Sequence, residues 1–346
     1  MRIDKYLTNK YPSLSRAYIK NQIKLGNFLV FNKKVESRLK NVASLFSEAG
    51  RNPAPKADQD KQSTSNSDLR LSGAGVKPSY ILREGDIVVF ALGFVLPDAV
   101  IILPNPAIKL NVIYEDADVL VINKPAGLSV HPRQDKNGLP LLPEINSTLV
   151  SGLLAYYSAI ASVGDNPLFR PGLVHRLDKD TSGVMIIAKN QRSFDWLKAQ
   201  FKEHQTAKKY IALTHGLFKE KQGVIKTILA RAKNNPTKQK ISAKEGKEAV
   251  TEYRVIKEFK SYSLIEAQPK TGRLHQIRVH LAHLGHSIVG DVKYGLKNEI
   301  KLAGLDRQFL HAKELKIILL DNKENTFVAP LPDDLLGVLQ ALEKNK

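Results

Sequence analysis

Residues 172–190, "GLVHRLDKDTSGVMIIAKN", place two aspartates, an arginine and a histidine directly before a continuous apolar run. The run at 184–188 predicts a buried strand, and such a strand would hold the preceding loop rigidly. A rigidly held carboxylate is what catalysis requires. Asp178 and Asp180 are therefore both candidates for a nucleophile or an acid/base group.

The same residues also fit a purely structural interpretation. Asp180, Thr181 and Ser182 can cap the backbone groups of a turn, and Gly183 can supply a permissive dihedral angle. On spacing alone, the catalytic and the structural interpretation are equally good, and Asp178 and Asp180 are interchangeable.

A second polar cluster is "PKTGRLHQIRVHLAHLGHSIVGDVKYG" at 269–295. Its apolar residues at helical spacing predict one buried helix face, with Gly285 ending the helix; they are Leu274, Ile277, Leu281 and Leu284. Arg278 falls about 40° from Leu274 on the helical wheel, at the edge of this face. A partly buried guanidinium needs a carboxylate partner. Pairing with Asp178 would keep that carboxylate ionised.

The histidines of this segment raise the question of a metal site. On a helix His280 and His283 face together, whereas His275 points away from His280 and His286 follows the terminating glycine. Zinc needs convergent ligands, so we expect no metal and favour polar-face or RNA-contacting histidines. The chain has no cysteine, which excludes disulfides, thiolate metal sites and cysteine nucleophiles.

Further strands are predicted in "NVIYEDADVLVINKP", "KKYIALTHG", "AVTEYRVIKEF" and "YSLIEAQP", with an amphipathic helix in "QRSFDWLKAQFKEH". The strands follow one another without regular intervening helices. This order favours an α+β fold with a central mixed, largely antiparallel sheet. Tyr210 begins one strand behind Lys208 and Lys209. Most such tyrosines pack, but in an RNA enzyme the ring could stack on a flipped base while its hydroxyl handles a proton.

The N-terminal segment is strongly basic. Residues 1–35 contain eight Lys or Arg residues and a single acid, Asp4. The stretch "SLSRAYIKNQIKLGN" predicts a helix that Ser13 or Ser15 can cap and Gly26 can end. A strand in "NFLVFNKKV" is expected to pair with one in "YILREGDIVVF".

The predicted N-terminal helix has two faces. Arg16, Lys20 and Lys24 recur at four-residue spacing, and Ile19 and Ile23 form an adjacent apolar stripe for a small core. A basic helix face is usually only solvated. Three aligned cations in a compact basic module nevertheless favour nucleic-acid binding.

The predicted domain organisation follows from composition. A small domain at 1–93 is interrupted at 36–75 by a Ser-, Asn- and Lys-rich insertion that is expected to be mostly flexible. A stretch with several prolines at 94–110 is expected to link it to a larger domain at 111–335, with 336–346 as a tail.

The whole chain has 346 residues and a net charge of +19. Such a charge favours polyanionic partners, although a basic surface can also serve solubility alone. No apolar run is long enough to span a bilayer, and the start of the chain lacks a secretory signal. We therefore expect a cytoplasmic protein, monomeric by default.

Together these segments resemble the RluA family of RNA pseudouridine synthases. The stretch "HRLDKDTSG" is similar to the family's signature loop. Other blocks follow in the family's order: "VINKPAGLSVHP", "KKYIAL", "GRLHQIRVHLAHLGHSIVGDVKYG", "FLHAKEL" and "FVAPLP". Leu274 departs from the family, which usually has Thr or Ser there. Residues 1–35 and 76–93 resemble an S-four-type RNA-binding domain, which often precedes this catalytic domain.

The resemblance implies a role for several residues. It makes Asp178 the catalytic aspartate and leaves Asp180 a structural role. It makes Arg176 the arginine that enters the RNA stack, Tyr210 the tyrosine that stacks on the base, and Arg278 the partner of the aspartate. The remaining candidates are His175 as an RNA contact and, as supporting residues, Thr181, Gly183, Arg273 and His275.

The activity implied is isomerisation of uridine to pseudouridine, which needs no cofactor because no atom is lost and no redox change occurs. The expected partner is RNA, most simply large-subunit ribosomal RNA, with neither membrane nor nucleotide cofactor involved. Alternatives are a transfer-RNA synthase of the same family, a non-catalytic RNA-binding assembly factor, and an RNA glycosidase that discards the base.

Overall fold

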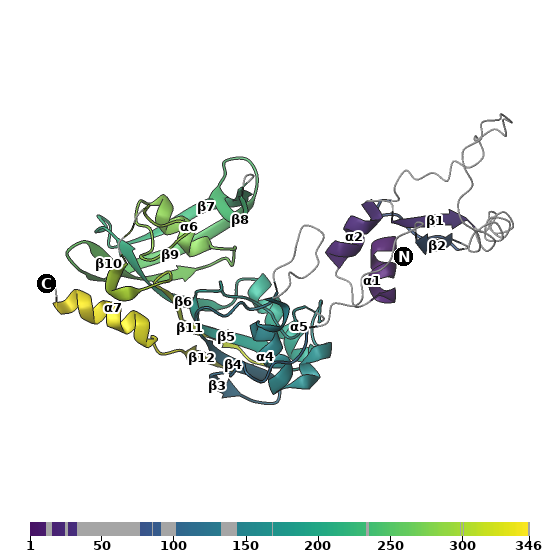
Figure 1. Ribbon diagram of the computed structural model, residues 1–346, viewed down its shortest axis with the longest axis horizontal. Coiled ribbons are helices and arrows are strands. Elements are labelled where there is room, and N and C mark those ends of the chain that lie inside the picture. Colours follow the sequence, from purple (N-terminus) through teal and green to yellow (C-terminus); the bar gives the residue numbers. More distant parts are fainter. Residues whose placement is uncertain are drawn as a thin grey trace, which may run out of the picture. The chain divides into compact units, whose positions relative to one another are not determined.

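The structure is a computed structural model of the chain (Figure 1). It describes residues 1–11, 16–24, 27–32, 77–84, 86–90, 102–132, 144–167, 169–232, 235–297, 299 and 301–344. The predicted cap at Ser13 or Ser15, the helix end at Gly26 and the insertion at 36–75 lie outside these residues.

The chain divides into two compact units. The N-terminal unit comprises Met1–Ile101 and Arg133–Leu141, and the larger unit comprises Ile102–Pro132 and Leu142–Lys346.

The N-terminal unit contains two helices and a two-stranded sheet. The elements are α1 (Ile3–Lys10), α2 (Arg16–Lys24), β1 (Phe28–Asn32) and β2 (Asp86–Phe90). The strands β1 and β2 pair antiparallel, as predicted. Both Ile19 and Ile23 are fully buried in a core with Ile3, Leu7 and Phe28, which confirms the predicted apolar stripe of the second helix.

The larger unit is built on a ten-stranded sheet of order β3-β4-β5-β11-β6-β10-β9-β7-β8, with β12 beside β11. The strands are β3 (Val112–Glu115), β4 (Val119–Lys124), β5 (Ser182–Ala188), β6 (Ala207–His215), β7 (Gln222–Ala232), β8 (Asn235–Ile241), β9 (Lys247–Glu258), β10 (Tyr262–Pro269), β11 (Leu310–Ile318) and β12 (Glu324–Val328). Every pairing is antiparallel except that of β5 with β11. The α+β class and the mixed, largely antiparallel sheet are thus confirmed.

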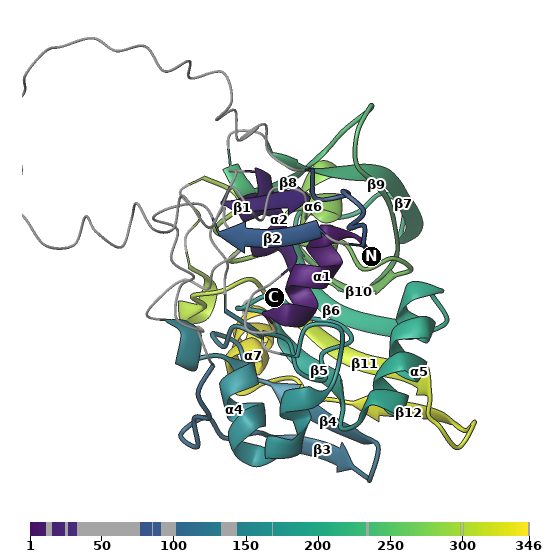
Figure 2. The ribbon, with the colours of Figure 1, turned by 90° about the vertical axis from the view of Figure 1, so that its right-hand side faces the viewer.

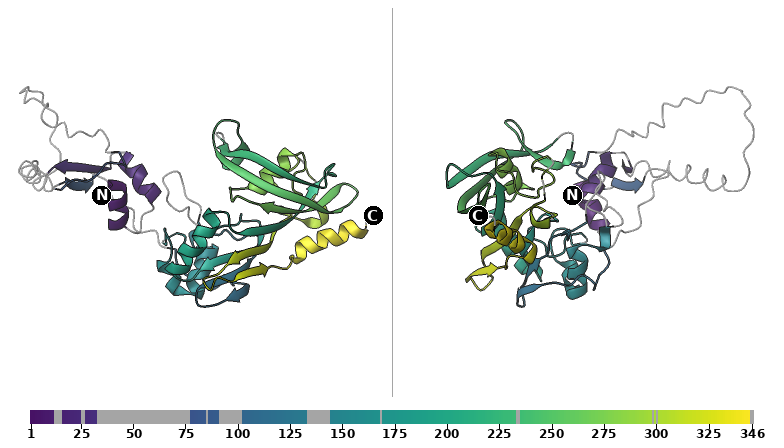
Figure 3. Two further views of the ribbon diagram at one scale, coloured as in Figure 1. Left: turned by 180° about the vertical axis from the view of Figure 1, so that it is seen from behind. Right: turned by 60° about the vertical axis from the view of Figure 1, so that its left-hand side comes forward.

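Helices cover the two halves of this sheet separately. α4 (Leu149–Tyr156) and α5 (Gln191–Lys202) pack with β4, β5 and β11, and Figure 2 shows α5 beside β11 and β12. α6 (Gln276–His283) and α7 (Asp333–Lys344) pack with the half around β6 and β10 (Figure 3). Short 3₁₀ helices complete the unit at Glu144–Asn146, Ser158–Ser162 and Leu302–Gly304.

The apolar run at 184–188 lies in β5, which is buried along its whole length. All seven residues of β5 are buried, as the apolar run predicts. Gly183 has φ = +121°, and a Cβ there would lie 2.2 Å from the carbonyl oxygen of Ala312 on β11. A side chain at this position would therefore force β5 and β11 apart. The predicted permissive dihedral angle is present, and the close strand approach adds a second reason for glycine.

Two predicted boundaries are wrong. Residues 102–110 are not linker but pack on the larger unit: the N–H of Asn105 donates to the carbonyl of Ser151 at 2.9 Å, and Ile102 is buried. The expected tail at 336–346 is instead mostly α7. Leu335, Val338 and Leu342 recur at helical spacing and are buried in the core of the larger unit.

Candidate active site

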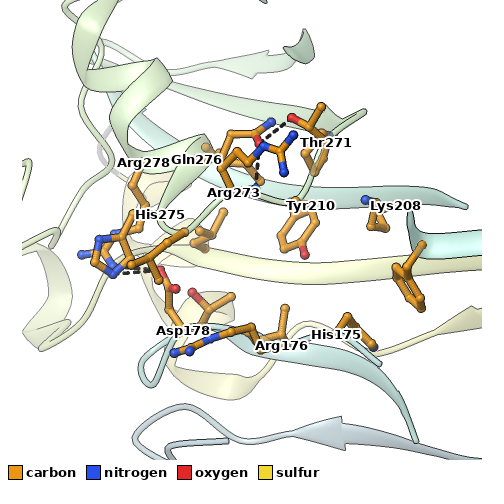
Figure 4. Close-up of a pocket in the computed structure, with 18 of the residues that line it drawn as sticks. His175, Arg176, Asp178, Lys208, Tyr210, Thr271, Arg273, His275, Gln276 and Arg278 are labelled. Atoms are coloured by element: carbon orange, nitrogen blue, oxygen red, sulfur yellow. Dashed lines mark hydrogen bonds and ion pairs between the residues drawn. The ribbon is translucent and has the colours of Figure 1, made fainter. Parts of the chain in front are cut away.

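Most of the predicted site residues of the larger unit line one cavity of about 590 Å³, whereas Asp180 and Gly183 are not part of its lining. The loop before β5 forms one wall, β6 forms the floor, and residues 269–278 form the opposite wall. Figure 4 shows Asp178 pointing toward Arg278 and His275, with Tyr210 and Lys208 projecting from β6. The two distant sequence clusters therefore meet at one place.

The predicted pairing of Asp178 with Arg278 is present. Nη1 of Arg278 donates to Oδ2 of Asp178 at 2.9 Å, and the arginine side chain is only 4% exposed. Its Nε and Nη2 donate to the two oxygens of Asp291, each at 2.7 Å. Burial opposes the charge, but the hydrogen bonds and charges of the two aspartates outweigh it and raise the pKa of Arg278. The guanidinium is thus a permanent cation shared by two carboxylates.

Asp291 also holds Arg278, and no pattern in the sequence marked it for that contact. It is fully buried on its side chain, and its Oδ1 also accepts the backbone N–H groups of Lys293 and Tyr294. Burial alone would raise the pKa of Asp291, yet Arg278 and these N–H groups lower it. Its position after Gly290 in a turn, rather than on a periodic element, gave no pattern from which to infer a partner for Arg278.

The side chain of Gln276 connects the start of α6 to β9 through hydrogen bonds. Its side-chain oxygen accepts from the hydroxyl of Thr271 at 2.6 Å and from the N–H of Arg273 at 3.0 Å. Its amide nitrogen donates to the carbonyl of Val250 and the hydroxyl of Thr251. A buried amide with all these bonds satisfied fixes the helix that carries Arg278.

The predicted helix around Arg278 begins later than expected. α6 starts at Gln276, so Leu274 precedes it and lines the cavity, while Leu284 is 39% exposed. The chain enters the helix through His275, which has a left-handed φ of 54°. Ile277 and Leu281 are buried and Gly285 adopts φ = +83° past the helix end, as predicted.

His275 connects Asp178 to Tyr294. The hydroxyl of Tyr294 accepts the N–H of Gln239 at 2.7 Å and lies 2.9 Å from Nδ1 of His275, and we infer that it donates its own proton to this nitrogen. Burial lowers the pKa of His275 to about 4, so the ring is neutral near pH 7. Its remaining proton is then on Nε2, 3.8 Å from Oδ2 of Asp178. The ring thereby presents an N–H to the carboxylate.

Tyr210 occupies the centre of the sheet. Its neighbours across the strands are Ala312 on β11 and Ala267 on β10. Residues directly opposite one another in antiparallel strands point to the same face, so two small side chains leave room beside the ring. Burial, with the Asp178 carboxylate nearby, raises the pKa of Tyr210. The phenol therefore keeps its proton at neutral pH.

Lys124 anchors the loop that carries Asp178. This lysine is fully buried and donates to three backbone carbonyls, those of Pro125, Leu128 and Lys179, at 2.6, 2.9 and 3.0 Å. Burial lowers the pKa of Lys124 to about 7. Because Lys179 follows Asp178 directly, this amine ties the loop to the end of β4. In the sequence Lys124 stands within the block "VINKPAGLSVHP", where no pattern assigns it a role.

Arg176 and His175 have different surroundings. Arg176 is exposed, and its Nη1 donates to Nε2 of His131 at 2.8 Å. His175 instead accepts the N–H of Ile186 at 3.0 Å and stacks on Phe201, with ring centroids 4.6 Å apart. Burial lowers the pKa of His175 to about 3. The structure thus gives His175 an anchoring task in the loop, while Arg176 faces solvent.

The other supporting residues also join elements. Thr181 accepts from the amide of Gln308 at 3.2 Å, and Arg307 donates to the carbonyl of Asp180. Arg273 donates from Nε to the carbonyl of Glu248 on β9. The polar groups after Asp178 therefore bind neighbouring segments and do not form the side-chain turn caps that their spacing allows.

Two of the cations predicted to line one face of the N-terminal helix lie close to the carboxylate of Asp4. Arg16 lies 3.0 Å and Lys20 3.8 Å from the carboxylate of Asp4, which also binds Arg2 and is fully buried. Lys24 is exposed at the end of α2. Two of the three predicted RNA contacts thus also hold the unit together.

The histidines do not converge. His280 lies between the hydroxyls of Thr227 and Thr251, and His286 stacks on Phe218. Among the residues that the structure describes, no three His, Asp or Glu side chains are arranged to hold a metal ion. No helix within the described ranges is long and apolar enough to cross a membrane.

Comparison with known proteins identifies the family. Residues 118–283 match the family model described as RNA pseudouridylate synthase. A Bacillus subtilis (strain 168) protein named uncharacterized RNA pseudouridine synthase YlyB is 36% identical over 288 residues, 83% of this chain and 89% of that protein. The chain belongs to the RluA family of RNA pseudouridine synthases. The resemblance of the sequence blocks is thereby confirmed, and the chain is an RNA pseudouridine synthase.

Two further matches agree with this family. The ribosomal large subunit pseudouridine synthase D of Zymomonas mobilis is 40% identical over 246 residues, 67% of this synthase and 74% of the relative. The solved structure of human RNA pseudouridylate synthase domain containing 1 aligns with a TM-score of 0.51 at 27% identity, covering 66% of this synthase and 86% of that chain.

Proposed function

We propose that this synthase converts specific uridines of large-subunit ribosomal RNA to pseudouridine, with Asp178 as its reactive carboxylate. The observation that carries the proposal is the placement of Asp178 at the cavity, held by the buried Arg278 beside the Tyr210 ring. The choice of RNA rests on relatives such as the Zymomonas mobilis protein, which is named for the large ribosomal subunit.

The reaction needs only the groups of this cavity. The N1–C1′ bond of uridine breaks, the uracil turns, and C5 bonds to C1′; C5 then loses its proton and N1 gains one. Asp178 either attacks C1′ and is displaced again when C5 bonds to C1′, or it removes a proton from C2′ and returns it to C2′ when C5 adds to C1′. No redox change occurs, so we propose that neither a nucleotide nor a metal cofactor takes part.

Other residues are assigned to holding the base. Tyr210 stacks on the uracil, and its protonated hydroxyl is suited to donate rather than to accept a proton. Arg176 fills the place that the flipped uridine leaves in the RNA, since its guanidinium is exposed at the loop. Extruding a base costs a few kcal/mol, and this arginine offsets part of that cost.

Tritium release from RNA labelled at C5 of uridine tests the catalytic role. Wild type should release tritium, and Asp178→Asn should lose at least about 10⁴-fold in rate because the reactive group is gone. Asp180→Asn, in the same loop, is the matched control and should lose only a few-fold. Equal losses in both variants would contradict the assignment. Free uracil in the products would indicate a glycosidase.

Mapping pseudouridines in RNA from cells with and without the gene tests the substrate. Loss of a site in large-subunit ribosomal RNA is expected. Loss confined to transfer RNA would move the proposal to that substrate, and no loss anywhere would favour a non-catalytic assembly factor.

We assign RNA binding by an S-four-type domain to the N-terminal unit, whose exposed cations include Lys24. The enzyme is proposed to act as a cytoplasmic monomer.

A further inference from the structure

Two adjacent lysines on β6 have opposite surroundings. Lys209 lies 2.9 Å from Glu314 on β11, and this hydrogen bond raises the pKa of Lys209. Lys208 points to the other face, where it lines the cavity beside Tyr210 (Figure 4). Within the described part of the chain, no carboxylate comes within ion-pair distance of Lys208. One lysine is therefore neutralised by the fold and its neighbour is not.

The surroundings of Lys208 are apolar or basic. Its Nζ lies 6.0 Å from the centroid of the Phe201 ring, which stacks on His175. Burial, and next the charge of Lys270, lower the pKa of Lys208 to about 8. The fold thus partly buries an ammonium group without giving it a counter-charge from the described residues, and an incoming anion would restore the lost solvation.

The lining of the cavity carries more positive charge. Its described lining includes Lys198, Lys202 and Arg231, and Asp178 is the only carboxylate in that lining. Lys198 is held by Asp165 at 2.7 Å, and Asp178 is held by Arg278. The cavity thus has one carboxylate, Asp178, whose charge Arg278 already balances, and a lining that is otherwise basic.

The spacing of residues on β6 sets the distance between Lys208 and a base stacked on Tyr210. Residues two apart on a strand are about 6.6 Å apart along it and point to the same face. A uridine stacked on Tyr210 would consequently have a neighbouring linkage within reach of the flexible Lys208 side chain. The chemical group that fits a desolvated ammonium at this distance from a nucleoside is a phosphodiester.

We propose that Lys208, with the basic surface at the end of α5, is a subsite for the RNA phosphodiester that flanks the target uridine. This inference rests on the proposed function, because it requires that the RNA enters this cavity. The subsite anchors the strand next to the flipped nucleotide, while Asp178 and Arg278 act on the sugar. Lys208 is assigned to binding and positioning, not to the bond-breaking step.

The experiment compares Lys208→Met with Lys209→Met on the RNA from which wild type releases tritium. Both variants remove one positive charge from the same strand, but only Lys208 faces the cavity. For Lys208→Met, KM should rise about fivefold or more with kcat within about twofold of wild type. The slope of log KM against log salt should fall by about 0.7–0.9, the value for one lost phosphate contact. Lys209→Met should match wild type in KM, kcat and slope.

Three outcomes would overturn the subsite. In the first, Lys208→Met leaves KM and the salt dependence of KM unchanged. In the second, Lys208→Met lowers kcat alone, as expected of a contact to the uracil ring. In the third, Lys209→Met raises KM as much as Lys208→Met does. A methylphosphonate linkage beside the target uridine tests the same contact without changing the protein. It should weaken binding by wild type, and no effect at either flanking linkage would also refute the proposal. Absence of tritium release by wild type would instead refute the proposed function, so the two failures are distinguishable.

Discussion

Arg278 holds two carboxylates that the fold treats differently. Asp291 is fully buried and receives two hydrogen bonds from the guanidinium at 2.7 Å each. Asp178 keeps 16% of its side chain exposed, and among the described residues its carboxylate receives one hydrogen bond, from Nη1 at 2.9 Å. The difference indicates a division of roles. Asp291 neutralises and orients the arginine, and the arginine in turn leaves one oxygen of Asp178 available to a substrate.

The largest expected effect separates these two aspartates by stability. Asp291→Ala leaves a buried guanidinium short of its main partner, so the free energy of unfolding should fall by about 3–5 kcal/mol. Asp178→Asn should change it by less than about 1 kcal/mol, since Arg278 keeps Asp291. Chemical denaturation monitored by circular dichroism measures both.

The matched control for Asp291→Ala is Asp334→Asn, which weakens the half-exposed pair with Arg307. It should cost under about 1 kcal/mol. Similar losses for Asp178→Asn and Asp291→Ala would show that Arg278 does not distinguish its partners, and the division of roles would fail.

Much of the Asp178 side could be predicted from the sequence. The apolar run of β5 located the rigid loop, and the helical wheel gave Arg278 a reason to seek a carboxylate. α6 begins two residues after Leu274, but Arg278 still lies at the edge of the buried face, because its position relative to Ile277 and Leu281 does not depend on where the helix starts. The separation of Asp178 from Asp180 needed the family resemblance.

The Asp291 side could not be predicted in the same way. Asp291 and Tyr294 lie in a turn, where residues follow no period that marks which side chains face inward. In the sequence Lys124 is a charged residue at the end of an apolar run, with no pattern that marks it as buried. Only the folded chain shows three carbonyls converging on its amine. Contacts of these residues join segments far apart in sequence, which local patterns do not encode.

A smaller effect is the pH dependence of stability that comes from the buried His280 on α6. Burial lowers the pKa of His280 to about 4, below the value of about 6.5 expected in the unfolded chain. Between these values the unfolded chain binds more protons, so stability falls as the pH drops from about 6.5 toward 4. At pH 5 this histidine alone should cost about 2 kcal/mol relative to pH 7.

His280→Gln removes that titration while leaving a side chain that can reach Thr227 and Thr251. The difference in the free energy of unfolding between wild type and this variant should narrow by up to about 2 kcal/mol from pH 7 to pH 5. Urea titrations at the two pH values measure it. A constant difference would mean that protonation of His280 is not coupled to folding, and that the framework around Arg278 tolerates charge.

The smallest effect tests whether the Asp291 turn also acts on Asp178 through His275. Tyr294→Phe keeps the ring, whose centroid lies 5.3 Å from the Arg278 guanidinium carbon, but removes the hydroxyl that binds Gln239 and His275. Nδ1 of His275 then loses its donor, and the N–H that faces Asp178 is no longer fixed. We expect kcat to fall about tenfold with KM nearly unchanged, and the free energy of unfolding to fall by about 1 kcal/mol.

Tyr253→Phe is the control, because that hydroxyl makes one long bond of 3.4 Å to the carbonyl of Glu220 and should be dispensable. Nitrogen-15 shifts of the His275 ring supply a readout that packing alone would not move: wild type should carry its proton on Nε2, and Tyr294→Phe should show a mixture of tautomers. A proton on Nδ1 in wild type, or an unchanged kcat in Tyr294→Phe, would contradict an effect of the Asp291 turn on Asp178 through His275. The turn would then serve only to hold Arg278. The two carboxylates would then communicate through the guanidinium alone, and the neutral imidazole beside Asp178 would be a packing residue.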